Sequence, residues 1–198
     1  MPIALNNSGN VTNCRFYPSK GSKKAVIMVG GIGGDFDSPA KNLYPKLAAK
    51  LASEGINALR IQFRYPTDLN ESVHDVLAGA KFLQNEGVDA LGLVGHSFGG
   101  AVVIRAGAKL EAVKTVVALA TQGLGADVVA DLSPHASILL IHGTNDETLS
   151  PENSSLVYSL AKEPKRLEIL EGNRHGLEES ADQLFQIVHD WLIKELSK

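Results

Sequence analysis

The chain has 198 residues, 44% of them hydrophobic, and a formal net charge of −3 at pH 7. This length and apolar content suit one domain with a substantial core, which we expect to span residues 1–198. The near-neutral charge balance, without any run of about five like charges, argues against nucleic acid and anionic membranes as partners.

Two features bear on where the protein works. Cys14 is the only cysteine, so no disulfide can form within the chain, and we expect this early residue to be structural. The first residues lack a basic region followed by an apolar stretch, and the most apolar segments are far shorter than the ~18 residues that span a bilayer. We therefore expect a cytoplasmic protein without a membrane segment.

Short β-branched runs alternate with longer amphipathic segments along most of the chain. In chain order they predict strand 25–29, helix 40–53, strand 57–63, helix 71–86, strand 90–94, helix 98–109, strand 114–119, a short helix at 126–131, strand 138–142, helix 151–162, strand 166–170 and helix 180–196. This alternation favours a doubly wound α/β fold, with about six parallel strands and helices on both faces of the sheet. Near the N-terminus, a turn-rich cluster between residues 3–5 and 11–17 predicts an antiparallel hairpin at the sheet edge.

Local signals set several helix limits. The Ser-Pro pairs at 38–39 and 150–151 can each cap and start a helix, and Gly55 and Gly87 can each stop one. In the last predicted helix, apolar residues three and four apart form one core-facing stripe. His189 follows this stripe, and we expect it to be a partly buried packing residue.

The pentapeptide Gly-His-Ser-Phe-Gly at 95–99 carries the strongest chemical signal. It lies between predicted strand 90–94 and the helix that follows. Glycines two positions either side of Ser97 permit a tight strand-to-helix turn that exposes the serine hydroxyl. This is the nucleophile-elbow pattern, so Ser97 is the candidate nucleophile.

A serine hydroxyl needs a histidine to accept its proton and an acid to hold that histidine in the correct tautomer. Strand 138–142 leads into a loop that contains Asp146, the candidate acid. Strand 166–170 leads into a glycine-flanked loop that contains His175, the candidate base. A turn-forming aspartate or a solvated loop histidine would be ordinary in isolation. Their order behind an elbow favours a catalytic triad.

Other acids and histidines fit these roles less well. Glu147 ranks second as the acid, while Asp127 and Asp131 come too soon and fall on the short predicted helix. His96 adjoins the nucleophile, and we expect it to pack or hydrogen-bond rather than to serve the serine. Neither His135 nor His142 has metal-ligand spacing, and no metal site is expected.

A tetrahedral intermediate also needs two backbone N–H donors directed at its oxyanion. Phe98, directly after the serine, is the first candidate. The glycine-rich loop after strand 25–29 offers the second, for which we favour Ile32, with Gly31 as the alternative. This loop does not match a dinucleotide fingerprint, because Phe36 stands where the final glycine is required, nor does it match a phosphate-binding loop. No cofactor is therefore expected.

Together these residues resemble the α/β-hydrolase family, over residues 25–196 and above all at 95–100, 142–146 and His175. Among its branches, the sequence looks like small dienelactone-hydrolase-like proteins and carboxylesterases or thioesterases. The resemblance implies a serine hydrolase with an acyl-enzyme intermediate. Dienelactone hydrolases proper have cysteine where this chain has Ser97, so their lactone chemistry is not implied.

About sixteen residues separate the strands that end near Ala120 and start near Ser137, too few for the helical cap domain that many relatives insert. We therefore expect an open site for small esters or for an acyl group attached to something bulky. Arg64 is expected to make a structural hydrogen bond, with an anionic substrate group as the alternative contact. A serine peptidase and a silent small-molecule receptor or scaffold remain alternatives, and the oligomeric state is left open.

Overall fold

The computed structural model describes residues 1–7, 9–132, 134 and 136–198, so His135 lies outside the described residues. An eight-stranded sheet runs through the molecule in the order β1-β2-β4-β3-β5-β6-β7-β8. Its strands are β1 (Pro2–Asn7), β2 (Asn10–Tyr17), β3 (Lys24–Val29), β4 (Asn57–Ile61), β5 (Ala90–His96), β6 (Val113–Leu119), β7 (Ser137–Gly143) and β8 (Lys165–Leu170).

Strands β3 to β8 are mutually parallel, which confirms the predicted set of six. β1 and β2 form the predicted antiparallel hairpin, and β2 joins the sheet antiparallel to β4. The strand ends are in register: Val29 of β3 pairs with Gly95 of β5, Leu119 of β6 with Ile141, and Gly143 of β7 with Leu170 of β8. The loops after these strands therefore emerge at one edge of the sheet.

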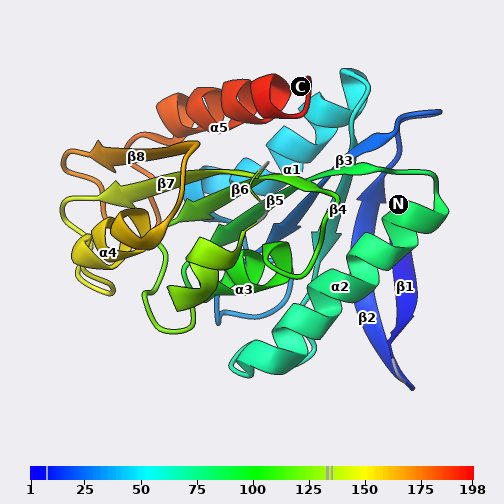
Figure 1. Cartoon of the computed structure of the whole chain (residues 1–198), viewed down its shortest axis with the longest axis horizontal. Helices are drawn as coiled ribbons and strands as arrows, with labels where there is room; N and C mark the ends of the chain where they lie inside the picture. Colours follow the sequence, from blue (N-terminus) through cyan, green and yellow to red (C-terminus); the bar gives the residue numbers. More distant parts are fainter. Residues whose placement is uncertain (8, 133, 135) are drawn as a thin grey trace.

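Helices cover both faces of the sheet (Figure 1). α1 (Pro39–Ser53) and α5 (Ala181–Glu195) pack on one face, whereas α2 (Leu69–Asn85), α3 (Phe98–Gly107) and α4 (Glu152–Leu160) pack on the other. A separate hydrophobic core fills each side, because alternate residues of the strands point to opposite faces. The doubly wound α/β architecture is confirmed.

The start of α1 differs from the predicted helix. Ala40, Lys41 and Asn42 have φ angles of 50°, 52° and 68°, so the right-handed helix begins only after them. The N–H of Ala40 donates to the carbonyl of Gly176 instead, at 2.8 Å, and Ser38 accepts from the N–H of Tyr44 rather than capping a regular first turn. A tertiary contact has thus overridden the local helix signal.

Three smaller differences from the predicted elements occur along the chain. β4 ends at Ile61 rather than at residue 63, because the N–H of Arg64 donates to the Asp75 side chain as the chain leaves the sheet. The segment predicted as a short helix at 126–131 is a 3₁₀ helix, Asp127–Asp131. α4 begins at Glu152 without a side-chain cap from Ser150. Gly55 and Gly87 follow helix ends with φ of 90° and 91°, as the sequence predicted.

Candidate active site

Ser97 sits in the turn between β5 and α3, with φ 57° and ψ −120°. Few side-chain-bearing residues adopt a positive φ, so the fold holds this serine in a strained conformation. The flanking glycines make the turn possible. A Cβ on Gly95 would lie 2.1 Å from the carbonyl oxygen of Gly99, and one on Gly99 would lie 2.2 Å from that of Gly30.

The structure brings Ser97, His175 and Asp146 together although they lie far apart in sequence. Nε2 of His175 is 3.0 Å from Oγ of Ser97, and Nδ1 of the same ring is 2.7 Å from Oδ2 of Asp146. The two ring nitrogens thus face the hydroxyl and the carboxylate on opposite sides. This arrangement can move a proton from the serine to the histidine while the carboxylate holds the ring.

The buried carboxylate of Asp146 is held by backbone as well as by His175. Its Oδ1 accepts from the N–H groups of Thr148 and Leu149, both at 2.9 Å. Burial on its own would raise the pKa of Asp146, but hydrogen bonds from Leu149, His175 and Thr148 lower it below the ordinary 3.8. Asp146 therefore stays ionised over the range in which a histidine base works. Glu147, the second-ranked acid, is exposed, whereas Asp146 is buried against His175.

The loops that carry Asp146 and His175 are bonded to each other. The N–H of Thr144 donates to the carbonyl of Leu170 at 3.0 Å, and the N–H of Asn145 donates to that of Asn173 at 2.9 Å. The loops approach so closely that a Cβ on Gly143 would lie 2.0 Å from the Asn173 oxygen. The acid and the base therefore share one cross-linked unit at the β7–β8 edge.

His96 lies beside this unit, in the position the sequence analysis anticipated. It is buried, its Nε2 is 2.9 Å from the carbonyl oxygen of His175, and the two imidazole centroids are 4.9 Å apart. Burial lowers the pKa of His96 below 6.5, against the opposing effect of the bond to that carbonyl. A neutral His96 that donates through Nε2 thus supports the backbone of His175.

Sequence reasoning missed His142. This residue ends β7 fully buried, with Nε2 3.0 Å from Oδ2 of Asp146. A histidine four positions before the candidate acid, at the end of an apolar strand, was the available signal, because a buried imidazole requires polar partners.

The predicted backbone N–H donors belong to the start of α3 and to the loop after β3. Phe98 is the first residue of α3, where a backbone N–H has no acceptor within the helix. In the facing loop, the N–H of Gly31 donates to Oδ2 of Asp37 at 3.3 Å. The N–H of Gly31, the alternative second donor, is thus engaged by a side chain of its own loop.

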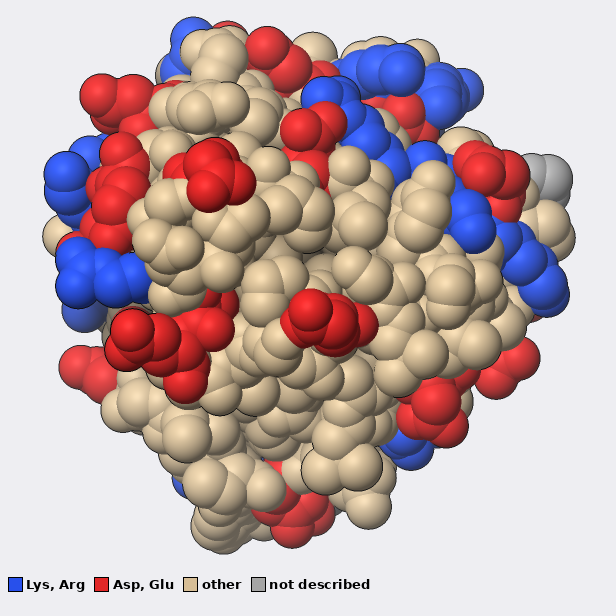
Figure 2. All heavy atoms as spheres, turned by 90° about the vertical axis from the view of Figure 1, so that its left-hand side faces the viewer, with Lys and Arg blue, Asp and Glu red and all other residues tan. Residues whose placement is uncertain are grey.

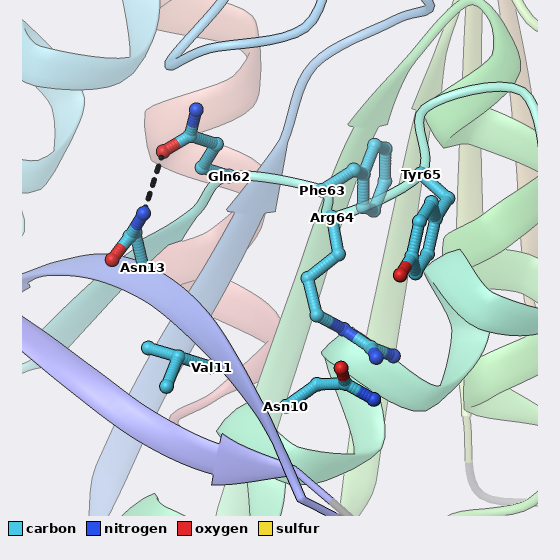
Figure 3. Close-up of a pocket in the computed structure, with 7 residues that line it drawn as sticks. All are labelled: Asn10, Val11, Asn13, Gln62, Phe63, Arg64 and Tyr65. Carbon is cyan, nitrogen blue, oxygen red and sulfur yellow. Dashed lines mark hydrogen bonds between the residues drawn. The ribbon is translucent and has the colours of Figure 1, made fainter.

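A polar pocket of about 310 Å³ lies between β2 and the segment that follows β4, lined by Asn10, Val11, Asn13, Gln62, Phe63, Arg64 and Tyr65 (Figure 3). One of its lining residues, Phe63, packs its ring edge-on against that of Phe98, with the centroids 5.9 Å apart. Arg64 contributes its guanidinium, which is paired with Asp75 at 2.5 Å and Glu71 at 2.7 Å. With its charge balanced by two carboxylates, Arg64 has the structural role that the sequence analysis favoured.

The other residues considered in the sequence analysis lie outside the triad. Cys14 is buried, and burial followed by the charge of Asp75 raises its pKa to about 12, so the thiol stays protonated. Asp127 and Asp131 lie on the 3₁₀ helix. Within the described part of the chain, no group of three or more His, Cys, Asp or Glu side chains could hold a metal ion.

The carboxyl ends of β7 and β8 lie at the left of Figure 1, and Figure 2 shows that side of the molecule. Much of this face carries neither basic nor acidic side chains, although one acidic group lies near its centre and a band of Lys and Arg side chains crosses its upper right part.

The sequence model of the dienelactone hydrolase family matches residues 40–190, a stretch that includes Ser97, Asp146 and His175. The chain belongs to the dienelactone hydrolase family. It is therefore a member of a family of hydrolases with the α/β-hydrolase fold. No curated protein matches the sequence.

Solved structures share the fold at low identity. Est1E from Butyrivibrio proteoclasticus superposes with a TM-score of 0.85 at 17% identity, over 100% of this chain and 99% of that one. Dienelactone hydrolase from Anabaena variabilis gives 0.84 at 18% identity, over 99% and 97%. The esterase domain of a Rhodothermus marinus protein gives 0.79 at 16%, over 99% and 98%. Est1E has also been solved with ferulic acid bound.

Among the described residues, no helix of this family member is long and apolar enough to cross a bilayer.

Proposed function

We propose that this member of the dienelactone hydrolase family is a serine hydrolase that cleaves carboxylic esters or thioesters through an acyl-enzyme. One observation carries the proposal: Ser97 Oγ, the two ring nitrogens of His175 and Oδ2 of Asp146 form a continuous hydrogen-bonded line with steps of 3.0 and 2.7 Å. Serine with a histidine base is the chemistry that this line supports.

In the first step, Nε2 of His175 takes the proton of Ser97 as Oγ attacks the substrate carbonyl carbon. The carbonyl oxygen becomes an oxyanion, which the N–H groups of Phe98 and Ile32 stabilise. His175 then gives its proton to the departing alcohol or thiol, and the acyl group stays on Oγ. The carboxylate of Asp146 stabilises the transient imidazolium.

In the second step, His175 accepts a proton from water, and the resulting hydroxide attacks the acyl carbon. The carbon–oxygen bond to Ser97 breaks, the serine recovers its proton from His175, and the carboxylic acid leaves. Neither step calls for a metal or an organic cofactor.

The substrate proposal rests on the open edge of a single domain without a cap. Among the described residues between β6 and β7, the short 3₁₀ helix Asp127–Asp131 is the one helical element that could cover the site. The balanced charge of Arg64 favours neutral esters. The likeness to Est1E makes a ferulate ester a useful member of a substrate panel.

Labelling with a fluorophosphonate probe tests the proposal directly, because such probes react with an activated serine. We expect labelling at Ser97, loss of labelling in Ser97→Ala, and retention in Ser155→Ala, a variant of an exposed serine on α4. Aryl esters and acyl thioesters of graded chain length, a ferulate ester and a peptide amide would then rank the leaving groups.

A folded protein that neither labels nor hydrolyses any member of the panel would refute the enzyme proposal and favour a silent receptor or scaffold. Turnover confined to the peptide amide would replace the proposal with a serine peptidase.

A further inference from the structure

Asp146 accepts a hydrogen bond from a second imidazole. His142 has no exposed surface, and its Nε2 lies 3.0 Å from Oδ2 of Asp146 and 2.9 Å from the carbonyl oxygen of Leu149. Both of these partners are acceptors, because Asp146 is ionised and a carbonyl cannot donate. Nε2 of His142 therefore carries a proton, which it shares between them.

The other face of the His142 ring meets a buried hydroxyl. Oγ of Ser154, on α4, lies 2.7 Å from Nδ1 of His142 and is itself fully buried. A hydroxyl can donate to the unprotonated Nδ1, which gives His142 the neutral Nε2–H tautomer. Ser154, His142 and Asp146 thus repeat the order of Ser97, His175 and Asp146, with the ring reversed, and the two lines meet at one oxygen.

We propose that His142 is a positioning residue for the reaction at Ser97, and that Ser154 holds His142 in the tautomer that donates to Asp146. The role rests on the proposed serine hydrolase function. By occupying one side of Oδ2, His142 fixes the plane of the carboxylate and limits how strongly that oxygen attracts the N–H of His175.

The saturation of the carboxylate supports this role. Oδ1 accepts from two backbone N–H groups, those of Thr148 and Leu149, and Oδ2 accepts from two imidazoles. Four donors use about all the lone-pair positions of a carboxylate, so its orientation is set from every side. Removing one donor leaves a buried oxygen underbonded and directs more of its negative charge at His175.

A neutral His142 also suits the catalytic cycle. When His175 takes the proton of Ser97 it becomes a cation beside Oδ2, and a second cation on the same oxygen would oppose it. A hydrogen bond from an uncharged ring orients the acid without that repulsion. This distinguishes His142 from a lysine or arginine in the same place.

The other groups around His175 would stay constant in a test of His142. Asp146 faces the ring from the loop after β7, and His96 faces it from the end of β5. Asp37, after β3, acts on His96 through its charge. On the loop of His175 itself, Arg174 is paired with Glu179 at 2.7 Å and interacts with the more distant charges of Glu178 and Glu147.

The experiment compares kcat/KM for an aryl ester across pH 5–9 in the wild type and four variants. His142→Leu removes the donor, His142→Gln retains an N–H donor, and Ser154→Ala removes the hydroxyl that fixes the tautomer. Ser137→Ala is the matched control: it also deletes a buried hydroxyl that is hydrogen-bonded, here to Thr115 at 2.9 Å, but at the opposite end of β7.

We expect His142→Leu to lower kcat/KM by about 10- to 100-fold, by analogy with the loss found when a hydrogen-bond partner that orients a metal-ligating side chain is removed. The acid limb of its pH profile should move to higher pH, because an underbonded Asp146 carboxylate attracts the N–H of His175 more strongly. His142→Gln should restore most of both properties, and Ser154→Ala should shift the limb in the same direction by less. Ser137→Ala should lower Tm without moving the limb.

The proposal would be overturned if the acid limb did not move in His142→Leu or Ser154→Ala and if their rate losses were no larger than that of Ser137→Ala. His142 would then be a packing residue. If His142→Leu does not fold, the same decision falls to Ser154→Ala against Ser137→Ala. A wild type without ester turnover or fluorophosphonate labelling would instead refute the serine hydrolase function itself, and the role of His142 with it.

Discussion

A Cβ atom on Gly99 would lie 2.2 Å from the carbonyl oxygen of Gly30, which joins the first turn of α3 to the end of β3 by direct backbone contact. This contact lets the helix after the nucleophile approach the loop that faces it across the candidate oxyanion hole. The spacing between the two proposed N–H donors therefore depends on a residue that contributes no side chain.

Gly99→Ala should accordingly destabilise the protein by at least about 3 kcal/mol, because backbone cannot move aside as a flexible side chain can. Urea unfolding would measure the change. Gly176→Ala is a suitable comparison, since the nearest atom to its new Cβ is Cγ of Glu178 at 3.4 Å. Equal midpoints for the two variants would contradict the close-contact argument.

Asp37 should matter for rate because it holds the N–H of Gly31 in the loop that also carries Ile32. We expect Asp37→Ala to lower kcat by roughly 10-fold, less than the 10²- to 10³-fold loss caused by removing an oxyanion donor outright. Asp35→Asn removes the same charge from the same loop and should leave kcat near the wild-type value. Steady-state kinetics on an aryl ester would decide, and equal effects of the two changes would point to charge alone.

Asp146→Asn should lower kcat by about 10³- to 10⁴-fold, as the corresponding change does in serine proteases, because an amide does not hold the required histidine tautomer. Glu147→Gln should keep most of the activity, since Glu147 is exposed. The ranking of the two acids would be wrong if Glu147→Gln lost more activity than Asp146→Asn.

The lowered pKa of Asp146 has a stability counterpart. A depressed folded-state pKa contributes stability that is present above the ordinary value of 3.8 and is lost as the pH falls through the folded value. The stability advantage of the wild type over Asp146→Asn should therefore shrink in acid, which urea titrations at pH 7 and pH 3 would reveal.

His189 gives a pH effect of the opposite sign, far from the site. Burial on its own would lower the pKa of His189, but hydrogen bonds to Glu54 and Asp190 raise it above 6.5. The stability that these contacts add is present in full below pH 6.5 and is lost as the pH rises through the folded value. We expect the Tm of His189→Gln to lie about 1–2 °C below that of the wild type at pH 5.5. At pH 9 the Tm difference should be smaller, because a neutral His189 forms no ion pair. An undiminished difference would assign the effect to the stacking of His189 on Phe185 instead.

The predicted elements were accurate where local pattern and tertiary structure agree. Alternating apolar runs located all six parallel strands, and the glycines around Ser97 located the turn, because both features are encoded within a few neighbouring residues. The order of Ser97, Asp146 and His175 along the chain then indicated which loops should meet.

Local sequence patterns did not predict the features that depend on contacts between residues far apart in the chain. The left-handed residues 40–42 follow from the bond between Ala40 and Gly176, more than a hundred positions later. For His142 the sequence analysis considered, and rejected, only a role as metal ligand. Its contact with Ser154 could not be foreseen, because it forms only when α4 packs on the sheet. His189 stacks as expected, but its ion pair with Glu54 joins two helices that sequence alone does not place together.

The bonds between the loops of Asp146 and His175 have a mechanical consequence. These loops are fastened to each other after β7 and β8, whereas the serine turn after β5 belongs to the middle of the sheet. Fraying at the β8 margin would carry base and acid away as a pair and leave the nucleophile behind. Catalysis would then fail reversibly at a temperature where the central strands are still intact, and the gap between Ser97 and His175 would open first.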